Sequence, residues 1–553
     1  MVAVLQPGWT EQVYPPRGGQ DHLGLGSVVT DRILPTLSPG INVLTPHPRY
    51  WSFYAFVVDE FWRRDLPRTS ASFRRFLRRK ESIFSIAGHM CDRTGGSHHA
   101  TPIGGRRVGP HVREGLSNYS ANFDYMKSSG GGYGLYYATV MQATGVVRLA
   151  DRDLGLPVDA VTRDVGRSLA DSFRAAIAPT RYWRRYFDKD DVPTAVIEEL
   201  AQSCCLCRLS DGAPDREPLV DVFLHGGHAS QSAARRLSLQ MVLEISKQSK
   251  GAELRQNDFR RLVMYQSAYD SQTDTETAKF IPPAHLTEVA RRWRLSQLRE
   301  MFNWSLNGMW QWLCEWGLSK QGDSHAIPLS ELRLVIDKLD LRQLPGVTSK
   351  AKSRIGDLLD ECRDLASMTD SLDDRWELWT DLSEDQLFVM LEEGEFDQDG
   401  QLAALVVMYV MCLARLANPD LPETVGAEDW RIVREGGAAR IGMQFALDQL
   451  RRDEQQDRSV ADVVWRVLND HVISQHERVA LAKLPDDTFR FRRESGRLRF
   501  FEQPVAYQRN DSRFNSLSTV CAELGWTGFL ADPSHKLTPE GERIRIHGDL
   551  NNS

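Results

Sequence analysis

The sequence has few cysteines and no apolar run long enough to cross a membrane. Its eight cysteines are spread through 553 residues, and five of them have no cysteine nearby in the sequence. A secreted disulfide framework needs closely spaced cysteines, so this usage indicates a reducing compartment, and we expect a cytoplasmic protein. The most apolar stretch, 402–416, contains Arg415 and is shorter than the about 20 residues of a membrane span. We therefore expect a buried helix there and no membrane partner.

The common catalytic motifs are also missing. The sequence has no GxxxxGK[ST] phosphate loop, no HExxH and no GxSxG, so the usual signatures of nucleotide hydrolases, zinc proteases and serine hydrolases are absent. Its CxxC, Cys204 to Cys207, has no second pair that would complete a zinc ribbon. We therefore predict no catalytic residue, no bound metal and no cofactor, and we favour a protein that is not an enzyme on its own.

The composition is that of a globular protein, with 41% hydrophobic and 26% charged residues. A chain of this length exceeds one hydrophobic core and should divide into several domains. We predict a mainly α, multi-domain protein with helices over 49–63, 70–87, 291–316 and 460–483. Its expected parts are a loop-rich basic N-terminal domain (1–150), a helical domain (151–368), an acidic linker or helix (369–400) and a helical region (401–553) ending in a winged-helix-like α+β module.

Charge is distributed unevenly along the chain. Residues 1–150 hold 17 Lys and Arg against 10 Asp and Glu, although the whole chain has a net charge of −7. This excess predicts an anionic partner for the first segment, and Arg106 and Arg107 are candidate nucleic-acid contacts within it. A matching acidic surface in the same protein explains the excess equally well. The acidic run 370–399 is a solvated helix and loop, a nucleic-acid mimic, or a cover for this basic segment.

The strongest pointer to nucleic acid is TFRFRRESGRLRF at 488–500. Aromatic and basic residues alternate on both sides of Glu-Ser-Gly, which predicts a β-hairpin with one wholly cationic face. A helix over 512–524 and a short strand within 536–546 would complete the winged-helix-like module. Arginines neutralise phosphates, and a two-stranded ribbon fits a groove of duplex DNA. Alternatively, the arginines cover apolar surface and pair with local acids. The candidate contacts are Arg490, Arg492, Arg493, Arg497 and Arg499.

Two groups of residues raise the possibility of a metal site. His89, Cys91, His98 and His99 lie close together, with His111 beyond them, and zinc accepts both imidazole and thiolate. A metal-dependent nuclease or hydrolase built on the His89–His111 loop is therefore an alternative function. The second group is the Ser203–Cys207 stretch, SCCLC. If it is helical, Cys204 and Cys207 share a face and act as small buried hydrophobes.

Arg49 begins the expected helix over 49–63 in the aromatic stretch TPHPRYWSFYAF. Apolar residues occupy two sides of this helix, which is typical of a core helix. A cation in the first turn opposes the helix dipole, so Arg49 is a candidate anion-binding residue. The anion is either an internal carboxylate, such as Asp31 or Asp59, or a bound phosphate.

The opening segment 21–58 resembles a poorly characterised bacterial family. The shared pattern is LG…R…LxPG…TxxxRYxxF, although family members usually have Arg-Ala-Arg before the tyrosine, where this chain has His47-Pro48-Arg49. Genes of that family often lie in antiphage defence islands beside helicase and nuclease genes. The resemblance therefore implies an accessory protein of a defence or DNA-processing system, and it supplies no catalytic residues. The matching residues are Leu23, Gly24, Arg32, Leu37, Pro39, Gly40, Thr45, Arg49, Tyr50 and Phe53.

Taken together, these features predict a non-catalytic subunit that binds nucleic acid, with DNA favoured, or that serves as a scaffold. Its protein partner would be a separate helicase or nuclease. A protein-binding sensor without DNA contact is the remaining alternative.

Overall fold

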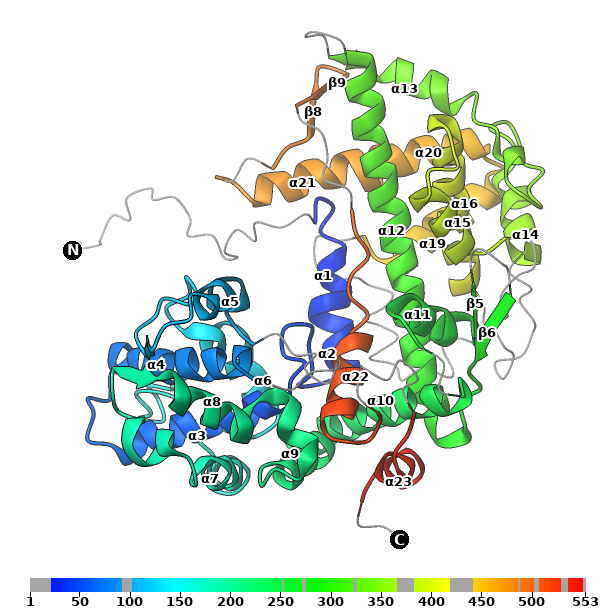
Figure 1. Ribbon diagram of the computed structural model, residues 1–553. Helices are drawn as coiled ribbons and strands as arrows, with labels where there is room; N and C mark the ends of the chain where they lie inside the picture. Colours follow the sequence, from blue (N-terminus) through cyan, green and yellow to red (C-terminus); the bar gives the residue numbers. More distant parts are fainter. Residues whose placement is uncertain are drawn as a thin grey trace. The chain divides into compact units, whose positions relative to one another are not determined.

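The computed structural model describes residues 21–91, 102–250, 253–270, 275–321, 326–365, 382–417, 441–485, 488–501, 507–528 and 536–550. These residues are mainly helical, as predicted (Figure 1). They form two compact units, and each unit combines segments from distant parts of the chain. Unit 1 comprises Met1–Ile33 with Arg294–Asn510, and unit 2 comprises Leu34–Trp293 with Asp511–Ser553.

The unit boundaries do not coincide with the divisions expected at 150, 368 and 400. Those divisions follow changes in composition along the chain, whereas the units are defined by packing between segments that are far apart in sequence. The helix α12 (Thr287–Gln321) contributes its first residues, up to Trp293, to unit 2 and the remainder to unit 1.

Unit 2 consists mostly of α-helices with three short antiparallel strand pairs, β1–β4, β2–β3 and β5–β6. Its α-helices are α2 (Leu34–Leu37), α3 (Arg49–Arg63), α4 (Ser70–His89), α5 (Gly105–Arg113), α6 (Ala138–Ala143), α7 (Val165–Ile177), α8 (Thr194–Cys204), α9 (Arg216–His225), α10 (Ala229–Gln248), α11 (Gln256–Tyr265), α22 (Phe514–Glu523) and α23 (Pro539–His547). Its strands are β1 (Asn118–Ser120), β2 (Val147–Arg148), β3 (Ala160–Val161), β4 (Asp191–Pro193), β5 (Ser267–Asp270) and β6 (Thr275–Lys279). Single π-helical or 3-10 turns are η2 (Tyr133–Tyr137), η3 (Tyr182–Tyr186), η4 (Leu206–Asp211) and η5 (Ala284–Leu286).

Helix α3 is the core helix that the aromatic spacing predicts, with the expected bounds. Every residue from Arg49 to Phe61 is buried, and the helix packs against α4, α7 and α9. Phe53 stacks on Phe84 of α4 with ring centroids 4.1 Å apart, and Phe173 of α7 meets Phe53 edge-on. Offset and edge-on rings of this kind add to the energy of burial, so the aromatic run serves as a core plug and not as an exposed stacking surface.

The strand expected within 536–546 is a helix, so that prediction was wrong. Helix α23 begins after Thr538, whose hydroxyl accepts a hydrogen bond from the amide of Gly541 at 3.1 Å, and Pro539 occupies the first helical position. A threonine cap followed by proline and acidic residues is a helix start. Gly541 permits close packing, because a Cβ there would lie 1.8 Å from the carbonyl oxygen of Trp526.

Unit 1 contains the rest of α12 and a second set of helices. They are α1 (Gly26–Val28), α13 (Leu329–Ile336), α14 (Ile355–Leu365), α15 (Glu384–Glu392), α16 (Gln398–Leu416), α19 (Met443–Gln455), α20 (Val460–Arg466) and α21 (Ser474–Ala482). The turns η1 (Val29–Ile33), η6 (Leu341–Gln343) and η7 (Val467–Ile473) accompany them, and the strands are β7 (Ile327–Pro328), β8 (Phe491–Glu494) and β9 (Arg497–Phe500). The helix expected over 460–483 is formed by α20, η7 and α21 in succession.

Helix α16 contains the apolar stretch 402–416 and lies inside unit 1. The helix extends beyond the stretch 402–416, so its length and composition alone would allow it to cross a membrane, which the shorter stretch did not suggest. However, 89% of its most apolar part is buried within the structure, as in the core helix of a globular protein. The charge it carries is matched internally, because Arg415 pairs with Glu384 of α15 at 2.6 Å and both side chains are fully buried. Glu384 belongs to the acidic run 370–399, of which residues 370–381 lie outside the described residues.

The predicted hairpin is confirmed. Strands β8 and β9 pair antiparallel, and the two residues between them, Ser495 and Gly496, have φ angles of 50° and 77°. A two-residue hairpin turn with positive φ at both positions matches the twist of the strands, and glycine favours it. Strand β7 extends the sheet in the order β7-β9-β8. The hairpin belongs to unit 1, whereas helices α22 and α23, which the sequence placed in the same winged-helix-like module, belong to unit 2. That module stays a prediction.

Candidate functional site

The outward face of the hairpin carries three of the candidate arginines. Phe491, Leu498 and Phe500 point inward and are buried, while Arg492, Glu494, Arg497 and Arg499 alternate with them and face outward. In the register of the two strands, Arg492 lies opposite Arg499 and Glu494 opposite Arg497. The side chains of Arg492 and Arg499 are 55% and 47% exposed, which leaves them accessible to an anionic partner.

The alternation of residues predicted a wholly cationic face, and this prediction was wrong. Glu494 lies on it and pairs with Arg492 at 2.7 Å and with Arg499 at 3.0 Å. Hydrogen bonding to Arg492, together with the charges of both arginines, lowers the pKa of Glu494, so this carboxylate is ionised at neutral pH. The outward face therefore presents three cations and one internal competitor for them.

The other two hairpin candidates contact helix α21, Arg493 through its side chain and Arg490 through its backbone amide. Arg493 donates to the Glu477 carboxylate at 2.8 Å and to the Ser474 hydroxyl at 2.8 Å, which fixes the hairpin to that helix. Arg490 is half-buried, and its backbone amide donates to Nε2 of His476 at 3.0 Å. Both arginines therefore hold the hairpin in place and are less accessible than the outward three.

The N-terminal candidates Arg106 and Arg107 are exposed in the first turn of α5. Arg107 pairs with Asp124 at 2.7 Å, and Arg78 of α4 binds the same carboxylate at 2.8 Å. Arg79, the neighbour of Arg78, pairs with Asp190 at 2.5 Å. Much of the basic charge in this part of the chain is therefore matched by acids of unit 2, as the internal-surface alternative proposed.

Arg49 binds an internal carboxylate and is fully buried. Its guanidinium lies 3.2 Å from both oxygens of Asp215, the residue preceding α9. The remaining donors reach the carbonyl oxygens of Cys205 and Ser203, each at 2.7 Å. Neither Asp31 nor Asp59 fills this role: the carboxylate that pairs with Arg49 is that of Asp215.

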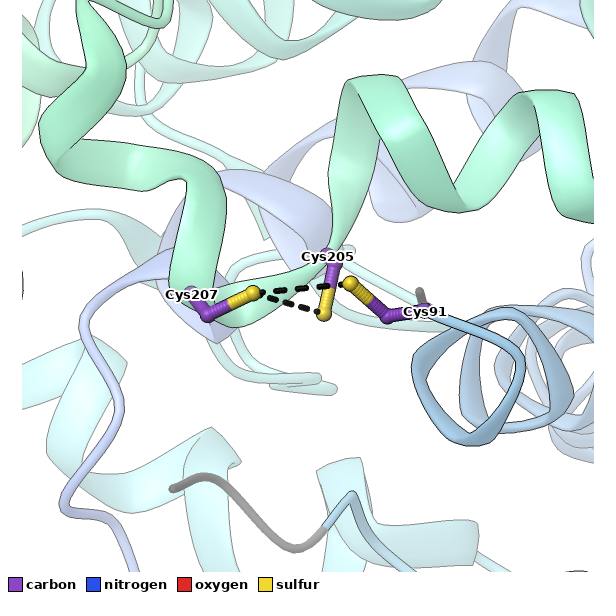
Figure 2. Close-up of side chains that lie close together, drawn as sticks. All are labelled: Cys91, Cys205 and Cys207. Carbon is purple, nitrogen blue, oxygen red and sulfur yellow. Dashed lines mark hydrogen bonds between the residues drawn. The ribbon is translucent and has the colours of Figure 1, made fainter. Parts of the chain in front are cut away.

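The peptide that Arg49 holds positions two cysteines. Helix α8 ends at Cys204, and the extended residue Cys205 leads into η4, so the segment is not the continuous helix that would pair Cys204 with Cys207. Instead the sulfur of Cys207 lies 3.5 Å from that of Cys205 and 3.6 Å from that of Cys91, which follows α4. Figure 2 shows the three side chains converging from these two segments. All three sulfur atoms lie within 4.8 Å of one another.

Cys204 belongs to a different environment. Its side chain lines a small apolar cavity with Phe53, Phe84 and Phe173, and burial raises the pKa of its thiol to about 12. The pKa of Cys205 is also raised, first by hydrogen bonding with the thiol of Cys207 and then with that of Cys91. These hydrogen bonds therefore favour the protonated form of the Cys205 thiol.

The His89–His111 loop is only partly described. His89 ends α4, and His111 in α5 stacks on Phe123 with ring centroids 4.0 Å apart. His98 and His99 lie outside the described residues. Among the described residues, the potential ligand group is made by Cys91, Cys205 and Cys207, and His111 is not a member of it. The sequence distance between Cys91 and the other two cysteines hid this group from local motif analysis.

Comparison with protein-family models, with curated proteins and with solved structures finds no match for the chain.

Proposed function

We propose that the protein is a non-catalytic nucleic-acid-binding or scaffolding subunit that acts with a separate helicase or nuclease in bacterial antiphage defence or DNA processing. The observation that carries the binding role is the outward face of the β8–β9 hairpin, with Arg492, Arg497 and Arg499 exposed together. The resemblance of segment 21–58 to the defence-island family supports the proposed context.

The hairpin has the chemistry for backbone contact more than for base recognition. Its arginines project from the backbone of a hydrogen-bonded sheet, so little backbone entropy is lost when they bind. Guanidinium groups bind phosphate oxygens in a bidentate manner, and each neutralised phosphate releases counterions from DNA. The wing-like hairpin would therefore supply affinity that depends on salt and little on sequence, leaving specificity and chemistry to the partner.

Binding of the full-length protein to fluorescein-labelled double-stranded DNA, single-stranded DNA and RNA at several salt concentrations tests this function. For the wild type we expect affinity to fall steeply with salt, with the slope of log K against log salt set by the number of phosphate contacts. The triple variant R492A/R497A/R499A should bind more weakly at low salt and lose roughly 1 from that slope for each phosphate contact removed.

A second triple variant, R342A/R354A/R458A, is the matched control. These arginines are also exposed in unit 1 and also pair with carboxylates, at 2.6, 3.3 and 3.5 Å, so the change in net charge is the same. The proposal requires this control to bind like the wild type. Absence of salt-sensitive binding, or equal losses in the two triple variants, would overturn it and leave the protein-binding sensor as the better account.

A further inference from the structure

We propose that Cys91, Cys205 and Cys207 form a zinc site that links the end of α4 to the α8–η4 connection in unit 2. This site does not depend on nucleic-acid binding, because its cysteines belong to unit 2 and the hairpin arginines belong to unit 1. It rests on the convergence of three sulfur atoms, on their spacing and on the way the surrounding residues fix them.

The spacing fits a common metal ion. Zinc binds thiolates at about 2.3 Å in tetrahedral geometry, which places the sulfur ligands roughly 3.8 Å from one another. The observed separations of 3.5 Å and 3.6 Å from Cys207, with all three sulfurs inside 4.8 Å, are close to that arrangement. A disulfide needs about 2.05 Å, involves two of the sulfurs and leaves the third unexplained.

The site is held by buried polar contacts that do not depend on a metal. Arg49 donates to the carbonyl oxygens of Ser203 and Cys205, and its other donors bind Asp215. Asp215 in turn accepts a hydrogen bond from the Ser52 hydroxyl at 2.6 Å. Residues that fix the backbone of a ligand set in this way are typical of metal sites, where they orient the ligands and tune their basicity.

Zinc binding would change the charge of the site and connect its two segments. On binding, each of the three thiols loses its proton to solvent, and three thiolates with one Zn²⁺ carry a net charge of −1. The Arg49 guanidinium contacts the Cys205 peptide, but its own charge is balanced by Asp215, so it fixes the ligand segment without adding net charge. Three thiolates leave one tetrahedral position for water or another ligand. Because the sulfurs come from segments 116 residues apart, the ion would act as a cross-link.

The test measures metal content and spectroscopy on the full-length protein. The purified protein is incubated with excess ZnCl₂ and dialysed exhaustively. We then expect about one zinc ion per wild-type chain by inductively coupled plasma mass spectrometry. Replacement of zinc by Co²⁺ should give a thiolate-to-cobalt charge-transfer band and the strong visible absorption of tetrahedral cobalt. The variants C91S, C205S and C207S should each lose the metal and the charge-transfer band.

Cys204→Ala is the matched control, since it removes a buried thiol from the adjacent position, which faces the aromatic cavity. It should keep both zinc and the cobalt spectrum. Alkylation of the wild type guards against variants that fail to fold: zinc should protect Cys91, Cys205 and Cys207 from iodoacetamide, and a chelator should remove that protection. Zinc-free wild type after incubation, equal loss in C204A, iron in place of zinc, or a disulfide among the three cysteines would each overturn the assignment.

Discussion

At the scale of single residues, unit 2 buries polar groups whose ionisation is costly. Glu81 of α4 is fully buried, and one of its oxygens accepts a hydrogen bond from the Gly132 amide at 2.8 Å. Burial raises the pKa of Glu81 to about 7, against 4.5 for an exposed glutamate. The hydroxyl groups of Tyr54 and Tyr125 lie in the same region but do not restore the ordinary value. The folded state therefore holds this proton more tightly than the unfolded chain does.

This difference predicts a pH dependence of stability. Between about pH 4.5 and pH 7 the folded state binds the Glu81 proton and the unfolded state does not, so the free energy of unfolding should fall as pH rises through this window. The full difference corresponds to about 3 kcal/mol above pH 7. In E81Q, which has no ionisable group at this position, the decline should be smaller. Urea denaturation of both proteins at pH 5 and pH 8 measures the change in the free energy of unfolding. An equal decline in the wild type and in E81Q would contradict the role of Glu81.

The arginines show what residue-level reasoning can and cannot supply. That Arg49 needs an anion follows from its place in the first turn of a helix. That the anion is Asp215 does not follow, because the two residues are 166 positions apart and are joined only by tertiary packing. The same limit applies to the cysteine group, in which Cys91 gives no local sign of its two distant neighbours.

At the scale of elements, sequence patterns predicted the helix and the hairpin whose formation depends on residues close together in the sequence. Helix α3 and the β8–β9 hairpin were predictable, since apolar spacing sets the first and a two-residue turn between alternating strands sets the second. Helix α23 was not, because Thr-Pro-Glu-Gly fits a turn and a capped helix start equally well. In the helical form Gly541 packs closely on the backbone of Trp526. That contact joins residues too far apart in the sequence for a local pattern to predict it.

One hairpin variant should strengthen nucleic-acid binding, whereas the arginine variants should weaken it. Glu494 competes with phosphate for Arg492 and Arg499, so its neutralisation in E494Q should make nucleic-acid binding tighter and steepen its salt dependence. The control is Asp360→Asn, because Asp360 is an exposed acid of unit 1 that pairs with Arg363 at 2.8 Å. Fluorescence anisotropy with the same labelled DNA should show a gain only for E494Q. A loss of affinity in that variant would mean that Glu494 orients the arginines instead of competing for them.

At the scale of the whole molecule, each unit contains a fully buried arginine–carboxylate pair. Arg49 and Asp215 form the pair in unit 2, and Arg415 and Glu384 form that in unit 1. Removing one partner leaves a buried charge uncompensated, which typically costs 3–5 kcal/mol. We therefore expect Asp215→Ala and Glu384→Ala each to destabilise the protein by about that amount.

Differential scanning calorimetry of these two variants reports whether the units melt separately. Two cooperative transitions are the expected result for a chain with two compact units, with Asp215→Ala lowering one and Glu384→Ala lowering the other. Asp190→Ala, which removes an exposed partner of Arg79, should change the free energy of unfolding of either unit by less than about 1 kcal/mol. If both buried-pair variants lower one common transition by the same amount, the two units unfold as a single cooperative system.

The interleaved order of the segments also affects how the protein can be made. During synthesis Leu34–Trp293 emerges early, but unit 2 lacks α22 and α23 until residues as far as His547 have been added. Unit 1 likewise includes residues up to Ile33 and is complete only when Asn510 has been added. An expression fragment cut at a single position therefore leaves at least one unit incomplete. Fragments intended to separate the units should instead join the two pieces of one unit through a designed linker.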